Sequence, residues 1–237
     1  MAAEWQDGIF RKIEDATYNT KRFWIEIPGA SAFDFRAGQF VTLDLPIHEN
    51  KHKRWRSYSI ASAPDGSNIF ELLIVQLDGG AGTSFLFNNI KENDPVAVKG
   101  PLGNFAIPEL DRDLFLICTG TGIAPFRSML HTIRQQQIPH RDIHLIFGTR
   151  TQRDLLYQEE MGQLEKDIPG FHFIPTLSRE DWNGRTGYVH EVYEALCASK
   201  QPAHFMLCGW KLMINEARQR LTEMGYDKKD VHFELYG

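Results

Sequence analysis

The sequence has few of the residues that hold metal centres and disulfides. Its 237 residues include only three cysteines, Cys118, Cys197 and Cys208, and no two of them stand in a C-x-x-C spacing. An odd number of widely separated cysteines is a poor disulfide framework, and no cysteine–histidine cluster offers ligands for zinc or an iron–sulfur cluster. We therefore expect free thiols in a reducing cytoplasm and no metal site.

Long apolar runs and an excess of positive charge are absent as well. No uninterrupted apolar stretch approaches the roughly 20 residues of a membrane-spanning helix. The N-terminus also lacks the basic flank and apolar core of a signal peptide. A net charge of −5 argues against general nucleic-acid binding, which requires excess positive charge. With 42% apolar and 24% charged residues, the composition is that of an ordinary globular protein without a membrane span.

The chain divides into two parts with different sequence rhythms. Up to about residue 108, short segments rich in β-branched and aromatic residues, such as 24–27, 39–45 and 69–75, alternate with glycine and proline turns. This pattern predicts a small antiparallel barrel, with one short helix near 83–90.

The second part alternates apolar runs with helical patterns, which predicts a parallel sheet covered by helices on both faces. We place the boundary near 108–111, giving domains of residues 1–108 and 109–237. The apolar runs begin near Leu114, Ile143, Phe171, His204 and Val231. The expected helices cover residues 125–137, 158–166, 189–198 and 212–224.

Two motifs of the first part suit a phosphate and a flat heterocycle. In an extended strand, Arg56 and Tyr58 point to one face, and Ser57 and Ser59 to the other. The arginine fork can grip a phosphate while the ring lies against a heterocycle, although an ordinary edge strand has the same pattern. Further on, 78–84 places three glycines before a helix, where Thr83 or Ser84 could cap the helix and bond a phosphate oxygen. A plain glycine-rich hairpin is the alternative there.

The second part contains a candidate nucleotide turn. Gly120-Thr121-Gly122 follows an apolar run and precedes a helix with Pro125 in its first turn, although the third glycine of the usual fingerprint is missing. A tight turn without a ligand is the alternative. Arg150, Arg179 and Arg185 follow successive strands, at the edge where parallel sheets collect ligands. Together they would suit a nucleotide 2′-phosphate, whereas a single surface arginine would mean nothing.

Three residues near the C-terminus are ambiguous when taken alone. Cys208-Gly209 ends an apolar run, Glu234 lies in the last strand, and Tyr236 is the penultimate residue. A buried cysteine is usually a small hydrophobic residue, and a terminal tyrosine is usually frayed.

In their order and spacing, these motifs resemble the ferredoxin–NADP reductase family of flavoproteins over nearly the whole chain. The resemblance implies an N-terminal six-stranded antiparallel FAD-binding barrel, followed by a five-stranded parallel Rossmann-like NADP-binding domain. The family's R-x-Y-S motif would place Arg56 on the FAD phosphates, Tyr58 against the flavin and Ser59 near flavin N5. Ser57 would also bind the cofactor. Ile74, Val75 and Gln76 would line the flavin, and Gly82, Thr83 and Ser84 would form the pyrophosphate turn.

The same resemblance implies roles for residues of the second part. Gly120, Thr121 and Gly122 would form the nicotinamide nucleotide turn, and Ser178 with the three arginines would bind the 2′-phosphate. Cys208, next to Gly209, would pack beside the nicotinamide. Glu234 would relay a proton to or from Ser59, and Tyr236 would stack on the flavin. Plant-type members end at this aromatic residue, whereas Gly237 follows it here.

The resemblance implies an oxidoreductase that exchanges hydride between NADP(H) and FAD, and single electrons with ferredoxin or flavodoxin. The basic run at 51–54 could dock an acidic carrier or form a solvated loop. One alternative is an NADH-dependent reductase component of an oxygenase system, because such relatives share the pattern at 182–190. The others are a non-catalytic electron-transfer subunit of the same fold and an enzyme that reduces free flavin.

Overall fold

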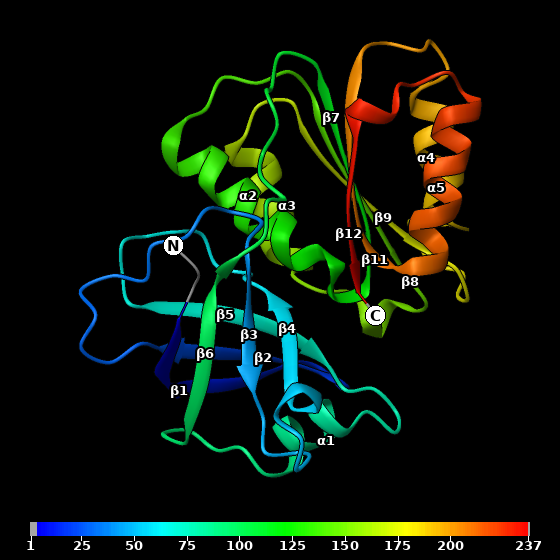
Figure 1. Ribbon diagram of the computed structural model, residues 1–237. Helices are drawn as coiled ribbons and strands as arrows, with labels where there is room; N and C mark the ends of the chain where they lie inside the picture. Colours follow the sequence, from blue (N-terminus) through cyan, green and yellow to red (C-terminus); the bar gives the residue numbers. More distant parts are fainter. Residues whose placement is uncertain (1–3, 237) are drawn as a thin grey trace. The chain divides into compact units, whose positions relative to one another are not determined.

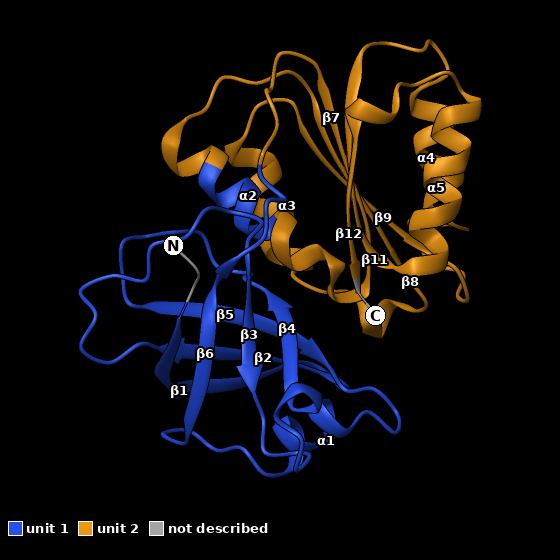
Figure 2. Cartoon of the chain, in the orientation of Figure 1, with its two compact units in different colours: residues 1–106, 127–132 blue, residues 107–126, 133–237 orange. Residues whose placement is uncertain are grey.

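The computed structural model describes residues 4–236, and the chain forms two compact units (Figures 1 and 2). Unit 1 comprises residues 1–106 and 127–132, and unit 2 comprises residues 107–126 and 133–237. Helix α2, Ile123–Gln136, is therefore divided, because its middle belongs to unit 1 and its two ends belong to unit 2.

Unit 1 is an antiparallel barrel of six strands in the order β4-β3-β6-β1-β2-β5. An isolated antiparallel bridge between Ile60 and Leu72 joins the two edges of this sheet, which closes the barrel and confirms the predicted fold. The strands are β1 Trp5–Thr17, β2 Thr20–Glu26, β3 Phe40–Asp44, β4 Trp55–Ser59, β5 Ile69–Val75 and β6 Pro95–Leu102. The short elements are η1 Lys51–Lys53 and helix α1 Ala81–Asn88.

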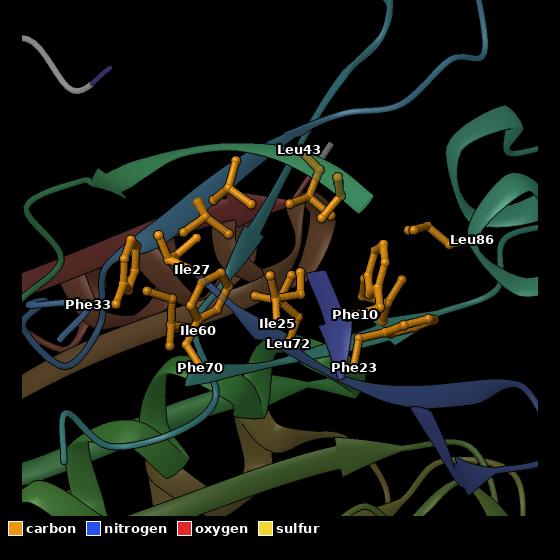
Figure 3. Packing of buried hydrophobic residues seen from close by; sticks show 14 of the residues in the cluster. Phe10, Phe23, Ile25, Ile27, Phe33, Leu43, Ile60, Phe70, Leu72 and Leu86 are labelled. Atoms are coloured by element: carbon orange, nitrogen blue, oxygen red, sulfur yellow. The ribbon is translucent and has the colours of Figure 1, made fainter. Parts of the chain in front are cut away.

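Apolar residues at alternate positions of these strands fill the barrel interior. Phe23 and Ile25 of β2 and Phe70 and Leu72 of β5 are completely buried, as expected for strands with one face toward a core. In Figure 3, Leu86 of α1 points toward the aromatic pair at one end of this core, so the helix closes that end. The two rings of that pair, Phe10 and Phe23, lie 5.7 Å apart in an edge-to-face arrangement.

Unit 2 is a parallel sheet in the order β10-β9-β8-β7-β11-β12. Its five long strands are the five predicted from the apolar runs, and the two-residue β10 adds a short sixth strand at the edge. The strands are β7 Asp113–Thr119, β8 Ile143–Thr149, β9 Phe171–Leu177, β10 Arg185–Thr186, β11 Ala203–Trp210 and β12 Val231–Tyr236. The remaining elements are η2 Gly120–Gly122, η3 Gln152–Asp154, α3 Gln158–Asp167, α4 Val189–Leu196, α5 Lys211–Glu223 and η4 Lys228–Asp230.

Helices cover the sheet of unit 2, as the alternating pattern predicts. Apolar residues of α4 and α5 form one core cluster with Phe115 of β7 and Phe205 of β11. Figure 1 shows α3 on the opposite face from α4 and α5. The carboxyl ends of β7, β8, β9 and β11, where the candidate nucleotide residues follow, therefore meet along one edge of the sheet. Among residues 4–236, every helix is too short or too polar to span a bilayer.

Candidate functional site

Arg56 lies directly against the first turn of helix α1. A Cβ atom at Gly82 would stand 2.9 Å from Arg56 Cγ and 3.0 Å from its Nε, so a side chain at this position would displace the arginine. The guanidinium is also held by the backbone that precedes it, because Nη1 donates hydrogen bonds to the carbonyl oxygens of Lys53 in η1 at 3.1 Å and Trp55 in β4 at 2.7 Å. A fixed guanidinium and the N-terminus of a helix thus converge, and both attract anions.

The glycine-rich segment before α1 differs from its expected form. The helix begins at Ala81 with Gly80 as its N-cap, and no side chain caps it. The prediction that Thr83 or Ser84 caps the helix is therefore wrong, because both residues lie inside the first turn. The Thr83 hydroxyl instead closes the preceding loop, since it accepts a hydrogen bond from Leu77 N and donates one to Gly80 O, each at 3.1 Å. The first N–H groups of the helix therefore receive no hydrogen bond from a capping side chain of the N-cap residue.

The four residues of the R-x-Y-S motif, 56–59, all lie in β4. Tyr58 is half-buried and packs on the barrel core, and this burial raises the pKa of its hydroxyl to about 12, an effect that Arg56 partly offsets. Ser59 is buried. Ser57 is exposed, and its hydroxyl shares a 2.9 Å hydrogen bond with Thr42 of β3.

The predicted flavin-lining residues of β5 lie next to this motif. Ile60, which directly follows the motif, forms an antiparallel bridge with Leu72 of β5. Ile74 is buried, Val75 is half-buried and Gln76 is exposed just beyond the strand. The structure therefore brings the motif of β4, the end of β5 and the turn before α1 to one region of unit 1.

In unit 2, the predicted nucleotide turn packs tightly against the carboxyl end of β11. A Cβ atom at Gly122 would stand 2.3 Å from the carbonyl oxygen of Cys208, so only glycine allows this approach. At the next position of β11, Gly209 is buried beside Thr119, whose hydroxyl accepts a hydrogen bond from Trp210 N at 3.2 Å. The turn at Gly120–Gly122 and the pair Cys208-Gly209 are far apart in the sequence. The parallel pairing of β7 with β11 brings them together.

The carboxyl group of Glu234 in β12 has a raised pKa. It stands opposite Cys208 in the pairing of β11 with β12. Its Oε2 atom is buried and bonds to no hydrogen-bond donor of the described chain. Burial raises the pKa of this carboxyl to about 7, so it can hold or release a proton near neutral pH. A buried carboxyl group with a shifted pKa is a candidate functional group.

The predictions for Tyr236 and Gly237 concern the last two residues of the sequence. The backbone of Tyr236 pairs with Trp210, but its side chain and the whole of Gly237 lie outside what the structure describes. The stacking expected of Tyr236, and the effect of Gly237 upon it, therefore stay predictions.

The three candidate phosphate-binding arginines lie at the carboxyl ends of β8 and β9 and in β10. The backbone N–H of Arg179 donates to the carbonyl oxygen of Arg150 at 3.0 Å, and Arg185 pairs with Thr176 of β9. Ser178 N bonds to Thr149 O at 3.0 Å. All three arginine side chains are exposed, and within residues 4–236 none of their guanidinium groups forms an ion pair with a carboxylate.

Two residues near these arginines were not recognised from the sequence. Trp182 donates a hydrogen bond to the carbonyl oxygen of Arg185, and Glu180 accepts one from the backbone of Gln152. The tryptophan lies in a motif visible in the sequence, but its contact is not. The bond of Glu180 joins residues 28 positions apart, and no local pattern announces it.

Comparison with known proteins agrees with this division into two nucleotide sites. Residues 8–107 match the Oxidoreductase FAD-binding domain, and residues 116–219 match the Oxidoreductase NAD-binding domain. The ferredoxin–NADP reductase B of Sorangium cellulosum is 38% identical over 216 residues, which cover 86% of each chain. The anthranilate 1,2-dioxygenase electron transfer component of Acinetobacter baylyi is 31% identical over 206 residues, covering 86% of this chain and 58% of that protein.

A solved structure shares both domains. A ferredoxin NADP+ reductase from Neisseria gonorrhoeae, crystallised with bound FAD and NADP, has a TM-score of 0.82 and 25% sequence identity, and the match covers 98% of this chain and 99% of that one. The motifs, the fold and these similarities lead to one assignment. The chain belongs to the ferredoxin–NADP reductase family of oxidoreductases, with an FAD-binding barrel and an NAD(P)-binding α/β domain.

Proposed function

We propose that the protein is a ferredoxin (or flavodoxin)–NADP reductase. The observation that carries this proposal is the set of three exposed arginines, with Ser178, at the carboxyl ends of the strands of unit 2, where none of the arginines pairs with a carboxylate of the described residues. Guanidinium groups of this kind distinguish NADP(H) from NAD(H), because only NADP(H) carries a 2′-phosphate. The relative from Sorangium cellulosum, which bears the same activity in its name, supports the proposal.

Residues 1–108 would bind FAD and residues 109–237 would bind NADP(H). The phosphates of FAD would lie between Arg56 and the first turn of α1, at Gly82, Thr83 and Ser84. The flavin would lie against Tyr58, with further contacts supplied by Ser57, Ser59, Ile74, Val75 and Gln76.

When bound, FAD would accept a hydride from NADPH and release its electrons singly to a protein carrier. The chain's own groups would bind, orient and protonate. The turn Gly120–Gly122 would present its backbone to the nicotinamide nucleotide, and Cys208 would form a small apolar wall beside the nicotinamide. Glu234, with its pKa near 7, would hold or donate a proton at working pH.

The carrier would be an acidic protein. Arg54 already forms an ion pair with Asp44 at 2.7 Å, whereas Lys51, His52 and Lys53 are exposed in η1. Their charge would favour encounter with an acidic ferredoxin or flavodoxin through electrostatic complementarity.

A second candidate is an NADH-dependent reductase component of an oxygenase system. The similarity to the anthranilate dioxygenase component favours it. The two candidates differ in the dinucleotide that they use, so the 2′-phosphate is the feature to test.

The deciding experiment is anaerobic reduction of the purified flavoprotein, followed at the flavin absorbance, with NADPH and NADH titrated separately. We expect NADPH to act at least about tenfold more efficiently, the effect of one or two charge-assisted hydrogen bonds. Arg179→Ala should remove most of that advantage and leave the NADH reaction unchanged. The matched control is Arg141→Ala, because Arg141 precedes β8 at the opposite end of the strand from Arg150. A preference for NADH in the parent protein would overturn the proposal in favour of the oxygenase-type reductase.

A further inference from the structure

The segment from Ser178 to Gly187 leaves β9 and folds back beside it. Its base is fixed by two hydrogen bonds, from Gly187 N to Leu177 O at 2.9 Å and from the Thr176 hydroxyl to Gly187 O at 3.0 Å. Because Arg179 and Arg185 lie near its two ends, the conformation of this segment sets the distance between two of the candidate phosphate ligands.

Trp182 packs against other residues of the same segment. Its indole N–H donates a hydrogen bond to the carbonyl oxygen of Arg185 at 2.7 Å. The six-membered part of the ring lies on Gly184, where a Cβ atom would stand 2.3 Å from Trp182 Cζ2. A side chain at Gly184 would therefore push the indole away and break its hydrogen bond. The indole is half-buried by these contacts although it belongs to a surface segment.

Glu180 fixes the other arginine-bearing loop. Its Oε2 atom accepts a hydrogen bond from the backbone N–H of Gln152 at 2.7 Å. Gln152 is the first residue of η3, and the first N–H groups of a helical turn have no partner within the turn. The carboxylate of one loop thus caps the turn that directly follows Arg150 in the other.

The negative charge of Glu180 is unfavourable at a site that binds a phosphate. A carboxylate that follows Arg179 in the sequence and bonds to Gln152, two residues after Arg150, reduces the attraction that these arginines exert on a phosphate. The hydrogen bonds of this segment account for a carboxylate here. One runs from Gln152 N to Glu180 Oε2, the other from Arg179 N to Arg150 O at 3.0 Å, and together they join the two loops.

We propose that Trp182 and Glu180 are positioning residues that hold Arg150, Arg179 and Arg185 in the arrangement that a 2′-phosphate requires. This inference rests on the proposed use of NADP(H). Neither residue would touch the dinucleotide, and each would act through the backbone that it holds. Affinity for the 2′-phosphate would then depend on preorganised loops and not on charge alone.

Two ligands isolate the 2′-phosphate, because adenosine 2′,5′-bisphosphate differs from adenosine 5′-monophosphate by that group alone. Calorimetric titration of the flavin-loaded protein with each should show that Trp182→Ala weakens binding of the bisphosphate by about fivefold or more, the loss of one net hydrogen bond. Binding of the monophosphate should not change. Gly184→Ala, which leaves Trp182 in the sequence, should have the same effect as Trp182→Ala. Asn183→Ala, an exposed neighbour in the same segment, is the matched control.

Conservative variants distinguish the positioning role of Trp182 and Glu180 from a general structural defect. Trp182→Phe keeps a ring over Gly184 but loses the N–H, so it should lie between the parent and Trp182→Ala. Glu180→Ala should weaken bisphosphate binding. Glu180→Gln keeps an acceptor for Gln152 N and removes the charge, so it should bind the bisphosphate at least as well as the parent. In steady-state assays of Trp182→Ala, KM for NADPH should rise. The kcat measured with NADH and the KM for NADH should both stay constant.

The outcomes distinguish this inference from the proposed function. If the parent protein binds both adenosine ligands equally, or if Arg179→Ala changes nothing, the proposed use of NADP(H) is wrong. If the parent discriminates and Arg179→Ala loses discrimination while Trp182→Ala and Gly184→Ala retain it, the positioning role alone is wrong. Equal weakening of both ligands by Trp182→Ala would also overturn it, because that result indicates a general structural defect.

Discussion

The guanidinium of Arg127 donates a hydrogen bond of 3.0 Å to the buried carboxylate of Glu71, although the two residues stand 56 positions apart in the chain. Arg22 donates two further hydrogen bonds to the same carboxylate, at 2.7 and 3.0 Å. Arg127 also donates to Ala61 O at 2.8 Å. One acidic side chain thus joins strands β2 and β5 to the middle of helix α2, and this contact explains why residues 127–132 group with the barrel of unit 1.

Removing this carboxylate should destabilise unit 1. Glu71 and Arg127 are almost fully enclosed, with side chains 3% and 11% exposed. Glu71→Ala would break the buried ion pair with Arg127, and the loss of one partner of such a pair costs about 3–5 kcal/mol in comparable sites. We expect a clear drop in the urea midpoint of the barrel, followed by the fluorescence of its tryptophans.

An exposed acidic residue supplies the control for this experiment. Glu49 is exposed in the connection between β3 and β4, and an exposed carboxylate of this kind contributes little to stability. Glu49→Ala should therefore leave the midpoint almost unchanged. If both variants unfold at the same urea concentration as the parent, the buried cluster does not stabilise unit 1 as argued.

This cluster marks a limit of what the sequence predicts. Apolar runs predicted the five long strands of unit 2, of which β7, β8 and β11 are buried on both faces, and strands such as β5 were visible from their β-branched residues. Strand β1 was not recognised, because only Gly8 and Phe10 of its 13 residues are buried, and charged side chains occupy much of the rest. The pairing of Glu71 with Arg127 was equally hidden, since a single contact between distant residues leaves no periodic pattern.

Gly82→Ala should weaken FAD binding. The new methyl group would stand within 3.0 Å of the Arg56 side chain and displace it, so the proposed phosphate site would lose its fixed guanidinium. We expect the dissociation constant for FAD to rise by about tenfold or more, the loss of one charge-assisted hydrogen bond. Fluorescence titration of the deflavinated protein measures it.

Another helical glycine gives the matched comparison. Gly162 lies inside α3, where an added Cβ would meet open space. Gly162→Ala should keep the FAD affinity of the parent and add slight stability, because alanine favours a helix over glycine. Equal FAD affinity in Gly82→Ala and the parent would contradict the placement of the phosphates between Arg56 and α1.

The convergence of Arg56 with Gly82 was predictable only in part. Each motif was visible in the sequence, and the family resemblance assigned both to one cofactor. Their contact was not, and neither was the start of α1 at Ala81, because a glycine N-cap gives no side-chain signal. Trp182 and Glu180 were missed for a related reason, since both act on backbone groups of other segments.

Glu234 should make stability and activity depend on pH near neutrality. In the unfolded chain its carboxyl titrates near the ordinary value of 4.5, and in the folded chain near 7. Between these values the folded protein holds a proton that the unfolded chain has released, so the free energy of unfolding falls as pH rises through this window. The loss is complete above about pH 7 and amounts to at most about 3 kcal/mol, since a tenfold change in proton binding corresponds to about 1.4 kcal/mol.

Glu234→Gln removes the titrating group and tests this assignment. The variant should unfold at higher urea than the parent near pH 8, and the difference should vanish near pH 4. If Glu234 supplies a proton, the pH profile of kcat should lose its inflection near 7 in the variant. The same difference in urea midpoint between variant and parent at both pH values would show that this carboxyl does not change its protonation on folding.

His144 should produce the opposite pH dependence in unit 2. Its ring lies between those of Phe115 and His172, with centroids 4.7 and 5.1 Å away, and its Nδ1 atom has no hydrogen-bond partner among the described residues. Burial, and then the charge of His172, lower the pKa of His144 below its ordinary 6.5, although Asp113 and Asp142 act in the other direction.

Above about pH 6.5 the folded and unfolded chains both carry neutral His144, so the residue adds no pH dependence there. Below this value the unfolded chain binds a proton that the folded chain resists. The free energy of unfolding should therefore fall on acidification, by up to about 1.4 kcal/mol for each pH unit, until the folded pKa is reached. His144→Phe keeps a ring between its neighbours and removes the titration, so on acidification from about pH 7 to 5 its urea midpoint should fall less than that of the parent. His48→Phe, at an exposed histidine, should retain the slope of the parent, and the same slope in His144→Phe would assign the acid sensitivity to another group.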